Sequence, residues 1–384
     1  MEASSSLGGL LMPPVMAIAG FLMADFLGVT YFEVIARGWA PALIFFGIIS
    51  LSVYLFTTRF IRGKGSSTDL GAESIIEKFS KMDVLNTAVF FVFIGILVYL
   101  MGVLWYEASR AALMIAMGLF ITSSILRMVF HPGTILDKIK EWVRCLRQAV
   151  EAFAGVTAPL ILLLAMLGVM VNMFVVSGWM IKLMALLATI GEFHVVALVG
   201  VAFAIGVFLG LGIPPSACYI LSAVILIPPL TEMGINPWVA HFFLFFIAVI
   251  SEYSPPTSLV AAVASRISGA SFMKTMMVTL QISVPFFFLT FAIFNWDILL
   301  LKPGLSQLTA LGALLVGCCT AAAGIHGRLF ERKIYDLSSR FLIILLALFI
   351  LYYPRGILSA LALIPAVVMI IFVVLRPEKA AVAA

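Results

Sequence analysis

The chain has 384 residues, of which 64% are hydrophobic and 11% are charged. Soluble globular domains are nearer half apolar and a quarter charged, so this composition excludes a soluble protein and predicts an all-α polytopic membrane protein. The formal net charge of +5 does not indicate a nucleic-acid partner, because the basic residues gather between the apolar runs. The expected surrounding is a lipid bilayer, and no residue pattern predicts a cofactor.

Long apolar runs predict the helices that lie in the membrane. They cover residues 1–27, 39–58, 86–105, 111–129, 156–176, 195–209, 217–230, 238–266, 277–296, 306–325, 341–353 and 357–375. Most approach the ~20 residues that a helix needs to cross a bilayer, whereas 341–353 needs flanking residues or a tilt. The runs 195–209 and 217–230 are shorter and enclose a Gly/Pro turn, so we predict a re-entrant hairpin over residues 195–230.

The distribution of lysine and arginine predicts which segments face the cytoplasm. Basic residues gather at 59–81, 127–147, 266–274, 328–340 and 376–379. If all of these segments are cytoplasmic, an even number of crossings must separate neighbouring segments. The predicted spans supply that number when the hairpin enters and leaves the membrane on the outside.

Residues 131–152 have the pattern of an amphipathic helix. One face carries charges, and the other carries Trp142, Val143, Leu146 and Val150. We interpret this segment as an arm helix that lies along the cytoplasmic interface of the membrane. A soluble connecting helix is the alternative interpretation.

Two Pro-Pro and hydroxyl clusters interrupt the apolar runs, at Gly210–Ala217 and at Ser251–Thr257. Consecutive prolines stop a helix, because each removes a backbone donor and clashes with the preceding turn. Within a bilayer, the interrupted backbone is tolerated only where protein buries it or where it lines a cavity. Paired interruptions at membrane depth therefore predict the ion and substrate site of a secondary transporter.

The residue types in these clusters indicate how the site would work. Sodium is a hard cation that prefers oxygen ligands, which unwound carbonyls and hydroxyl groups provide. The predicted ion-binding residues are Gly210, Gly212, Ser216, Ser251, Ser254 and Thr257, with Glu252 as a direct ligand or a proton carrier. An anionic substrate would be held by amides at half-helix N-termini, at positions Pro13, Pro14, Pro215, Ala217, Pro255 and Pro256. No other metal site and no catalytic residue are predicted.

Each of these residues also has a structural interpretation. The Pro-Pro turns can be kinks that let helices pack, and Glu252 can be a protonated, hydrogen-bonded packing residue. His241 lies on the same apolar run as Glu252, and we predict that it is a satisfied structural histidine rather than a titrating group.

An internal repeat relates the two ends of the membrane region. Met12–Ala19 followed by Ala24–Glu33 has the same order of features as Ser254–Ala261 followed by Ser265–Lys274. In each copy a Pro-Pro break precedes a helix of small residues, a glycine-centred turn and a span with a further proline. The first turn is acidic and the second is basic, so the positive-inside rule places them on opposite sides of the membrane and predicts an inverted-topology repeat.

The repeat divides the chain into four predicted parts. Residues 1–130 hold the remainder of the first repeat with connecting spans, and 131–152 form the arm. Residues 153–297 hold the second repeat, with the hairpin 195–230 and a broken helix over 238–266, and 298–384 form the C-terminal helices. Because only twelve residues precede Pro13, we expect that a first hairpin belongs to a portion missing before Met1.

Several motifs resemble a known family. Glu2–Met16, Met23–Val29, Gly210–Ala217, Ala240-His241 and Ser254–Pro256 resemble the large membrane subunit of TRAP transporters, in particular the fused permeases that work with TAXI-type solute-binding proteins. The C-terminal hydrophobic pair over 354–375 resembles the tail of that family. The chain departs from the family at Pro215-Ser216, where paired hydroxyl residues are more usual, and at Glu252, where a small neutral residue is more usual.

The resemblance implies an elevator-type permease in a bacterial inner membrane. Such a protein imports organic acids, such as dicarboxylates or glutamate-like acids, using a sodium or a proton gradient. A periplasmic TAXI-type binding protein delivers the substrate. A small TRAP membrane subunit, or the missing N-terminal portion, is the other expected partner.

Other functions are less consistent with the sequence. A membrane enzyme needs a nucleophile–base or metal constellation, which four scattered histidines and one buried acid do not make. An ion channel usually builds its filter from symmetric subunits, whereas an inverted repeat favours alternating access. A truncated, non-transporting remnant that inserts into the membrane but does not cycle stays open as an alternative.

Overall fold

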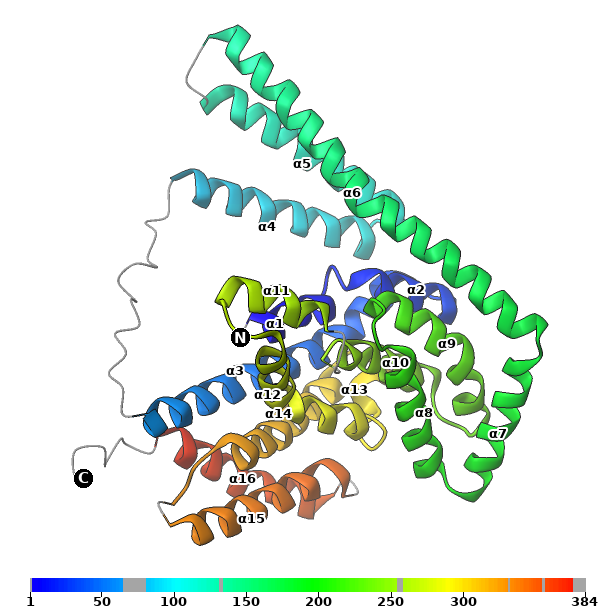
Figure 1. Ribbon diagram of the computed structural model, residues 1–384, viewed down its shortest axis with the longest axis vertical. Coiled ribbons are helices and arrows are strands. Elements are labelled where there is room, and N and C mark those ends of the chain that lie inside the picture. Colours follow the sequence, from blue (N-terminus) through cyan, green and yellow to red (C-terminus); the bar gives the residue numbers. More distant parts are fainter. Residues whose placement is uncertain are drawn as a thin grey trace. The chain divides into compact units, whose positions relative to one another are not determined.

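A computed structural model describes residues 2–64, 81–130, 134–253, 258–330, 332–353 and 356–375 (Figure 1). Over these residues the secondary structure is helical, and no strand occurs among them. Eight helices are long and apolar enough to cross a membrane within the described part of the chain. The prediction of an all-α polytopic membrane protein is therefore confirmed.

The chain divides into two compact units, which we describe separately. The first unit covers 1–29, 33–67 and 177–384, and the second covers 30–32 and 68–176. The helices of the first unit are α1 (Glu2–Leu11), α2 (Ala17–Leu27), α3 (Tyr31–Lys64, from residue 33 on), α7 (Trp179–Phe193), α8 (Val195–Leu209), α9 (Pro215–Glu232), α10 (Pro237–Ser251), α11 (Leu259–Ser268), α12 (Phe272–Ala292), α13 (Ile298–Leu301), α14 (Leu305–His326), α15 (Lys333–Tyr352) and α16 (Ile357–Leu375). Those of the second unit are α4 (Lys81–Gly102), α5 (Ala108–Phe130) and α6 (Ile135–Val176).

Helix α10 forms the core of the first unit. Residues 239–251 are all buried, which fits a helix that is apolar on every side. Its phenylalanines make edge and tilted ring contacts with α12 and the turn that follows it. Phe246 packs on Phe286 of α12 with ring centroids 5.4 Å apart, and Phe243 packs on Phe294 with centroids 4.9 Å apart. Helices α8, α9 and α12 pack directly against α10, so the hairpin, α10 and α12 share one core.

Arg37 joins the first turns of α3 to other elements of the first unit. Its guanidinium lies 3.9 Å from the ring centroid of Trp238 at the start of α10, and its Nε donates to the Leu301 carbonyl at 3.3 Å. The guanidinium also lies 3.7 Å from the Glu33 carboxylate. A cation inside a membrane-spanning helix is costly without such partners, so these contacts explain how α3 accommodates it.

The two predicted repeat copies have the same order of local structures. In the first, α1 and α2 flank the Pro13-Pro14 turn; in the second, α10 ends at Ser251 and α11 begins at Leu259. Helix α2 ends at Gly28 with φ 65°, and α11 ends at Gly269 with φ 67°, conformations that favour glycine. A long helix with an internal proline follows each turn, as predicted from the sequence. The opposite orientation of the copies remains a prediction.

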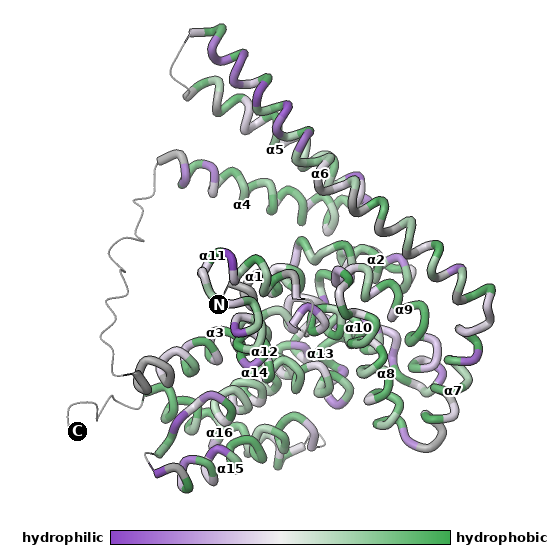
Figure 2. Tube along the Cα trace, in the orientation of Figure 1, coloured by the Kyte–Doolittle hydropathy of each residue, from purple (hydrophilic) through white to green (hydrophobic). Residues whose placement is uncertain are grey.

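The structure differs from the predicted boundary of the arm helix. From residue 135 on, the arm expected over 131–152 and the span expected over 156–176 belong to one helix, α6, which has 42 residues, whereas 131–133 lie outside the described residues. The segment between them, Glu151–Thr157, has no proline and a single glycine. A glycine costs a helix only about 1 kcal/mol relative to alanine. Pro159 follows two residues later, and α6 continues through it although it removes one helical hydrogen bond. Figure 2 shows that polar residues concentrate in the first half of α6 and apolar residues in the second.

The left-handed turn at Gly269 gives a stability prediction. Replacing Gly269 by alanine is expected to destabilise the protein by about 1 kcal/mol, because a side chain is strained at this positive φ. The midpoint of thermal unfolding in detergent should fall by about 2–4 °C. Gly95→Ala in α4 is the matched control, because an added Cβ meets open space there at an ordinary helical φ. Equal losses in both variants would contradict the role of the turn.

Candidate functional site

A tight loop joins the two short helices of the hairpin, α8 and α9. Local hydrogen bonds hold it: the Gly210 amide donates to the Gly206 carbonyl at 3.0 Å, and the Ile213 amide donates to the Gly210 carbonyl at 3.4 Å. Gly212 adopts φ 79°, which a side chain would strain. Pro215 occupies the first position of α9, where its fixed φ and missing amide hydrogen cost nothing.

The hairpin loop lies directly against the end of α10. A Cβ added to Gly210 would overlap the side chain of Ser251 and would lie 2.7 Å from the Cys218 sulfur. Only a glycine therefore permits this approach. The structure brings together Gly210 and Ser251, two residues predicted for the ion site that lie about forty positions apart in the chain.

The end of α10 is buried and polar. The Ser251 hydroxyl donates to the Ala248 carbonyl at 2.7 Å and lies beside the Cys218 thiol. Glu252 is 7% exposed and lies near enough to Cys218 for an electrostatic interaction. Ser251, Glu252, Gly210 and Cys218 thus form one buried cluster where the hairpin meets α10. Of these, Cys218 was not predicted, because a cysteine in an apolar helix carries no distinguishing signal.

Tyr253 follows this cluster in the chain, and its side chain neighbours that of Ser283. The hydroxyls of Tyr253 and of Ser283 in α12 are buried, and neither has a hydrogen-bond partner among the described residues. The two side chains are neighbours, without a hydrogen bond of good geometry between them. An unpaired buried hydroxyl costs about 1–3 kcal/mol, so a polar occupant beside them would stabilise the structure.

The other predicted site residues have different surroundings. Ser216 is half-buried in the first turn of α9, where its amide has no intrahelical acceptor. The Ala217 amide instead donates to the Pro214 carbonyl at 3.0 Å, so this predicted donor is already engaged. Pro13 packs toward α3, where its ring lies 3.7 Å from a Cβ built at Gly38. Ser254, Pro255, Pro256 and Thr257 lie outside the described residues.

An aromatic cluster connects α2 to the hairpin. The Tyr219 hydroxyl lies 2.7 Å from Nδ1 of His241, and both side chains are buried. Phe26 of α2 stacks on the His241 ring with centroids 6.0 Å apart and an interplanar angle of 26°. The prediction that His241 is a satisfied structural histidine is therefore confirmed. Its partners come from α2 and α9, and no local sequence pattern pairs side chains so far apart in the chain.

The close approach at Gly210 gives a second stability prediction. Gly210→Ala should destabilise the protein by about 1–3 kcal/mol, since the added methyl group overpacks a filled contact. Gly200→Ala, in α8 of the same hairpin, is the control, because no atom lies within 4 Å of its added Cβ. Thermal unfolding in detergent would compare the two. If Gly210→Ala unfolded at the same temperature as Gly200→Ala, the hairpin loop would not lie against Ser251 in solution.

Residues 1–296 of the chain match the family model described as Tripartite ATP-independent periplasmic transporter, DctM component. The match spans well over half of the chain and includes both predicted repeat copies, the hairpin and the buried cluster at Ser251. No curated protein matches the chain.

Proposed function

Because the chain belongs to the DctM family of tripartite ATP-independent periplasmic (TRAP) transporters, we propose that it imports organic acids, such as dicarboxylates or glutamate-like acids, using a sodium gradient. The family is a transporter permease component and not an enzyme, and its members work with a periplasmic binding protein and a small membrane subunit. The organic-acid class, the coupling ion and a TAXI-type binding protein are the specific parts of the proposal. A proton gradient is the alternative driving force.

The contact of Gly210 with Ser251 is the main support for a sodium-binding site at the hairpin. Helix α8 ends at Leu209 and α10 ends at Ser251, so this contact joins the C-terminal ends of two half-helices. The last carbonyls of a helix carry partial negative charge. Those of Gly206, Phe208 and Ile250 each accept a turn hydrogen bond, and a carbonyl oxygen has a second lone pair for a cation. With the Glu252 carboxyl in the same cluster, the site offers oxygen ligands and negative potential to a sodium ion.

The start of α9 supports the proposal for an anionic substrate. No side chain caps this helix, and Pro215 has no amide hydrogen, so the first free donor is the Ser216 amide. By contrast, the Ser258 hydroxyl already accepts from the Ala261 amide at the start of α11, at 3.1 Å. An acid group would therefore find its donor at the Ser216 end of the hairpin.

The proposed transport cycle uses the repeat. A binding protein delivers the acid outside a bacterial inner membrane, cations fill the site at the hairpin, and the loaded core moves against a scaffold in an elevator mechanism. The shared local structure of the two repeat copies supports this mechanism, because inverted repeats generate two alternating states.

Uptake by proteoliposomes tests the proposal. The chain would be reconstituted with the small membrane subunit and given a binding protein loaded with radiolabelled dicarboxylate or glutamate. We expect an inward sodium gradient to drive accumulation and a pH gradient alone to have no effect. Stimulated counterflow without any gradient would identify a carrier, whereas uptake that is independent of both gradients and shows no counterflow would contradict secondary transport.

The buried carboxyl at the cation site gives a sharper prediction. Glu252→Gln should raise the sodium concentration for half-maximal uptake by about tenfold or more, because it removes a charged ligand. The matched control is Glu232→Gln at the exposed end of α9, which should leave the sodium dependence unchanged. An unchanged sodium dependence in Glu252→Gln would remove this residue from the site, and a lost pH dependence would indicate a proton carrier instead.

A further inference from the structure

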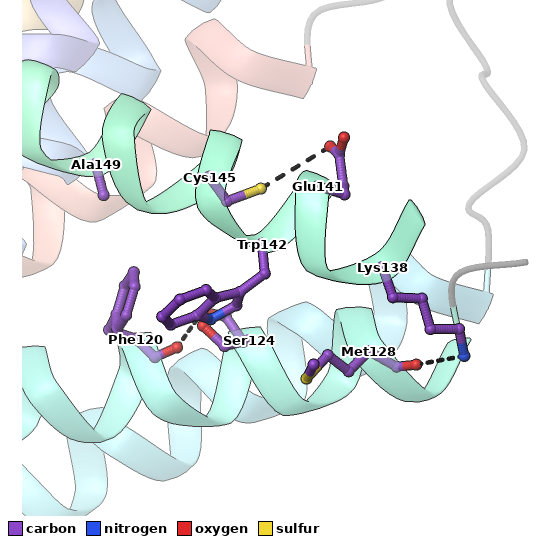
Figure 3. Close-up of a pocket in the computed structure, with 9 residues that line it drawn as sticks. Phe120, Ser124, Met128, Lys138, Glu141, Trp142, Cys145 and Ala149 are labelled. Carbon is purple, nitrogen blue, oxygen red and sulfur yellow. Dashed lines mark hydrogen bonds between the residues drawn. The ribbon is translucent and has the colours of Figure 1, made fainter. Parts of the chain in front are cut away.

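Helices α5 and α6 of the second unit enclose a cavity of about 160 Å³ (Figure 3). Its apolar wall is formed by Phe120 and Met128 of α5 and by Trp142 of α6, whose indole ring points toward α5. The two helices run side by side along this stretch (Figure 1). Nothing in the proposed transport site uses this cavity.

The rim of the cavity is polar. Lys138 lies at one end, where its ammonium donates to the Met128 carbonyl at 2.7 Å. An ammonium has three donors, so two remain for a ligand. Ser124 is half-buried in the lining, and the Glu141 carboxylate at the rim is neutralised by Arg144 at 3.1 Å. A cation and a hydroxyl beside an aromatic wall match a molecule with an acidic head and an apolar body.

The depth of the cavity in the membrane identifies the kind of molecule. The apolar window of α5 ends at Leu126, next to the lining residues Ser124 and Met128. The charges of α6 lie in the half of the helix that lines the cavity (Figure 2). The cavity therefore lies where hydrocarbon gives way to headgroups, a level at which tryptophan is enriched. Only 6% of the α5 window is buried among the described residues, so its apolar side chains are accessible to lipid.

We propose that the α5–α6 cavity binds a membrane glycerophospholipid, with its phosphate at Lys138 and Ser124 and the start of an acyl chain against Phe120 and Trp142. A soluble phosphate compound would leave the aromatic wall unfilled. The volume accommodates the glycerol-phosphate region, and the chains continue along the apolar side chains that α5 exposes to the bilayer. The bound lipid fills the cavity between the two helices near their charged ends.

Cys145 provides a reporter for this site. It lines the cavity and is half-buried, whereas Cys218 and Cys318 are buried in the first unit. The rate of maleimide modification of Cys145 in the full chain would be followed by mass spectrometry of its peptide, in detergent with and without added phosphatidylglycerol or phosphatidylethanolamine. We expect either phospholipid to slow modification by about tenfold, the effect of a charged hydrogen bond combined with a filled cavity. Inorganic phosphate and glycerol 3-phosphate should not slow it.

Three variants separate a specific site from general micelle effects. Lys138→Met should abolish the protection, Lys138→Arg should retain it, and Lys140→Met, an exposed lysine on the same helix, should leave it intact. Native mass spectrometry should show a retained phospholipid in the unmodified protein and in Lys138→Arg, but not in Lys138→Met. Circular dichroism confirms that each variant keeps its helices. Protection by inorganic phosphate alone, equal protection in Lys138→Met and Lys140→Met, or no retained lipid would each overturn the proposal.

Discussion

The approach of the hairpin loop to the end of α10 is the constraint on which the rest of the first unit depends. Gly210 has no side chain, and the space that a Cβ would occupy is taken by Ser251. Because the loop can come this close, the C-terminal carbonyls of α8 and α10 share one buried place with Glu252. A larger residue would separate the two half-helix ends and disperse their negative potential.

Burial of α10 fixes the position of Ser251, the residue that the hairpin loop contacts. Its phenylalanines pack against α12 and the turn after it, and its His241 is hydrogen-bonded to Tyr219 of α9. Phe26 of α2 stacks on the same histidine, so α2, far away in the chain, contacts α10 directly. Because Ser251 is closely packed, its side chain has no space to move away, and the hairpin loop approaches it through a residue without a side chain, Gly210.

Features set by local chemistry could be predicted from the sequence, and those set by tertiary pairing could not. Left-handed glycines end helices through their own backbone, so the turn at Gly269 followed from residue type. The Pro13-Pro14 pair separates α1 from α2, whereas α9 continues through Pro228-Pro229, so a proline pair alone does not decide where a helix ends. The continuity of α6 through residue 152 was missed because a change from charged to apolar residues was read as a boundary, although it does not break helical hydrogen bonds. The Tyr219–His241–Phe26 cluster was missed because no local pattern pairs side chains from three helices.

The same helical backbone therefore serves two different purposes in the two units. In the first, helices are interrupted so that the ends of α8 and α10 meet, which concentrates partial charge inside an apolar core. In the second, α6 continues through Pro159 from a charged half to an apolar half, and its recognition falls to its side chains. The proposed ion site lies at the broken helices, where carbonyl and hydroxyl groups and the Glu252 carboxyl are the available oxygen ligands. A side-chain cavity at the membrane interface suits a ligand that stays bound.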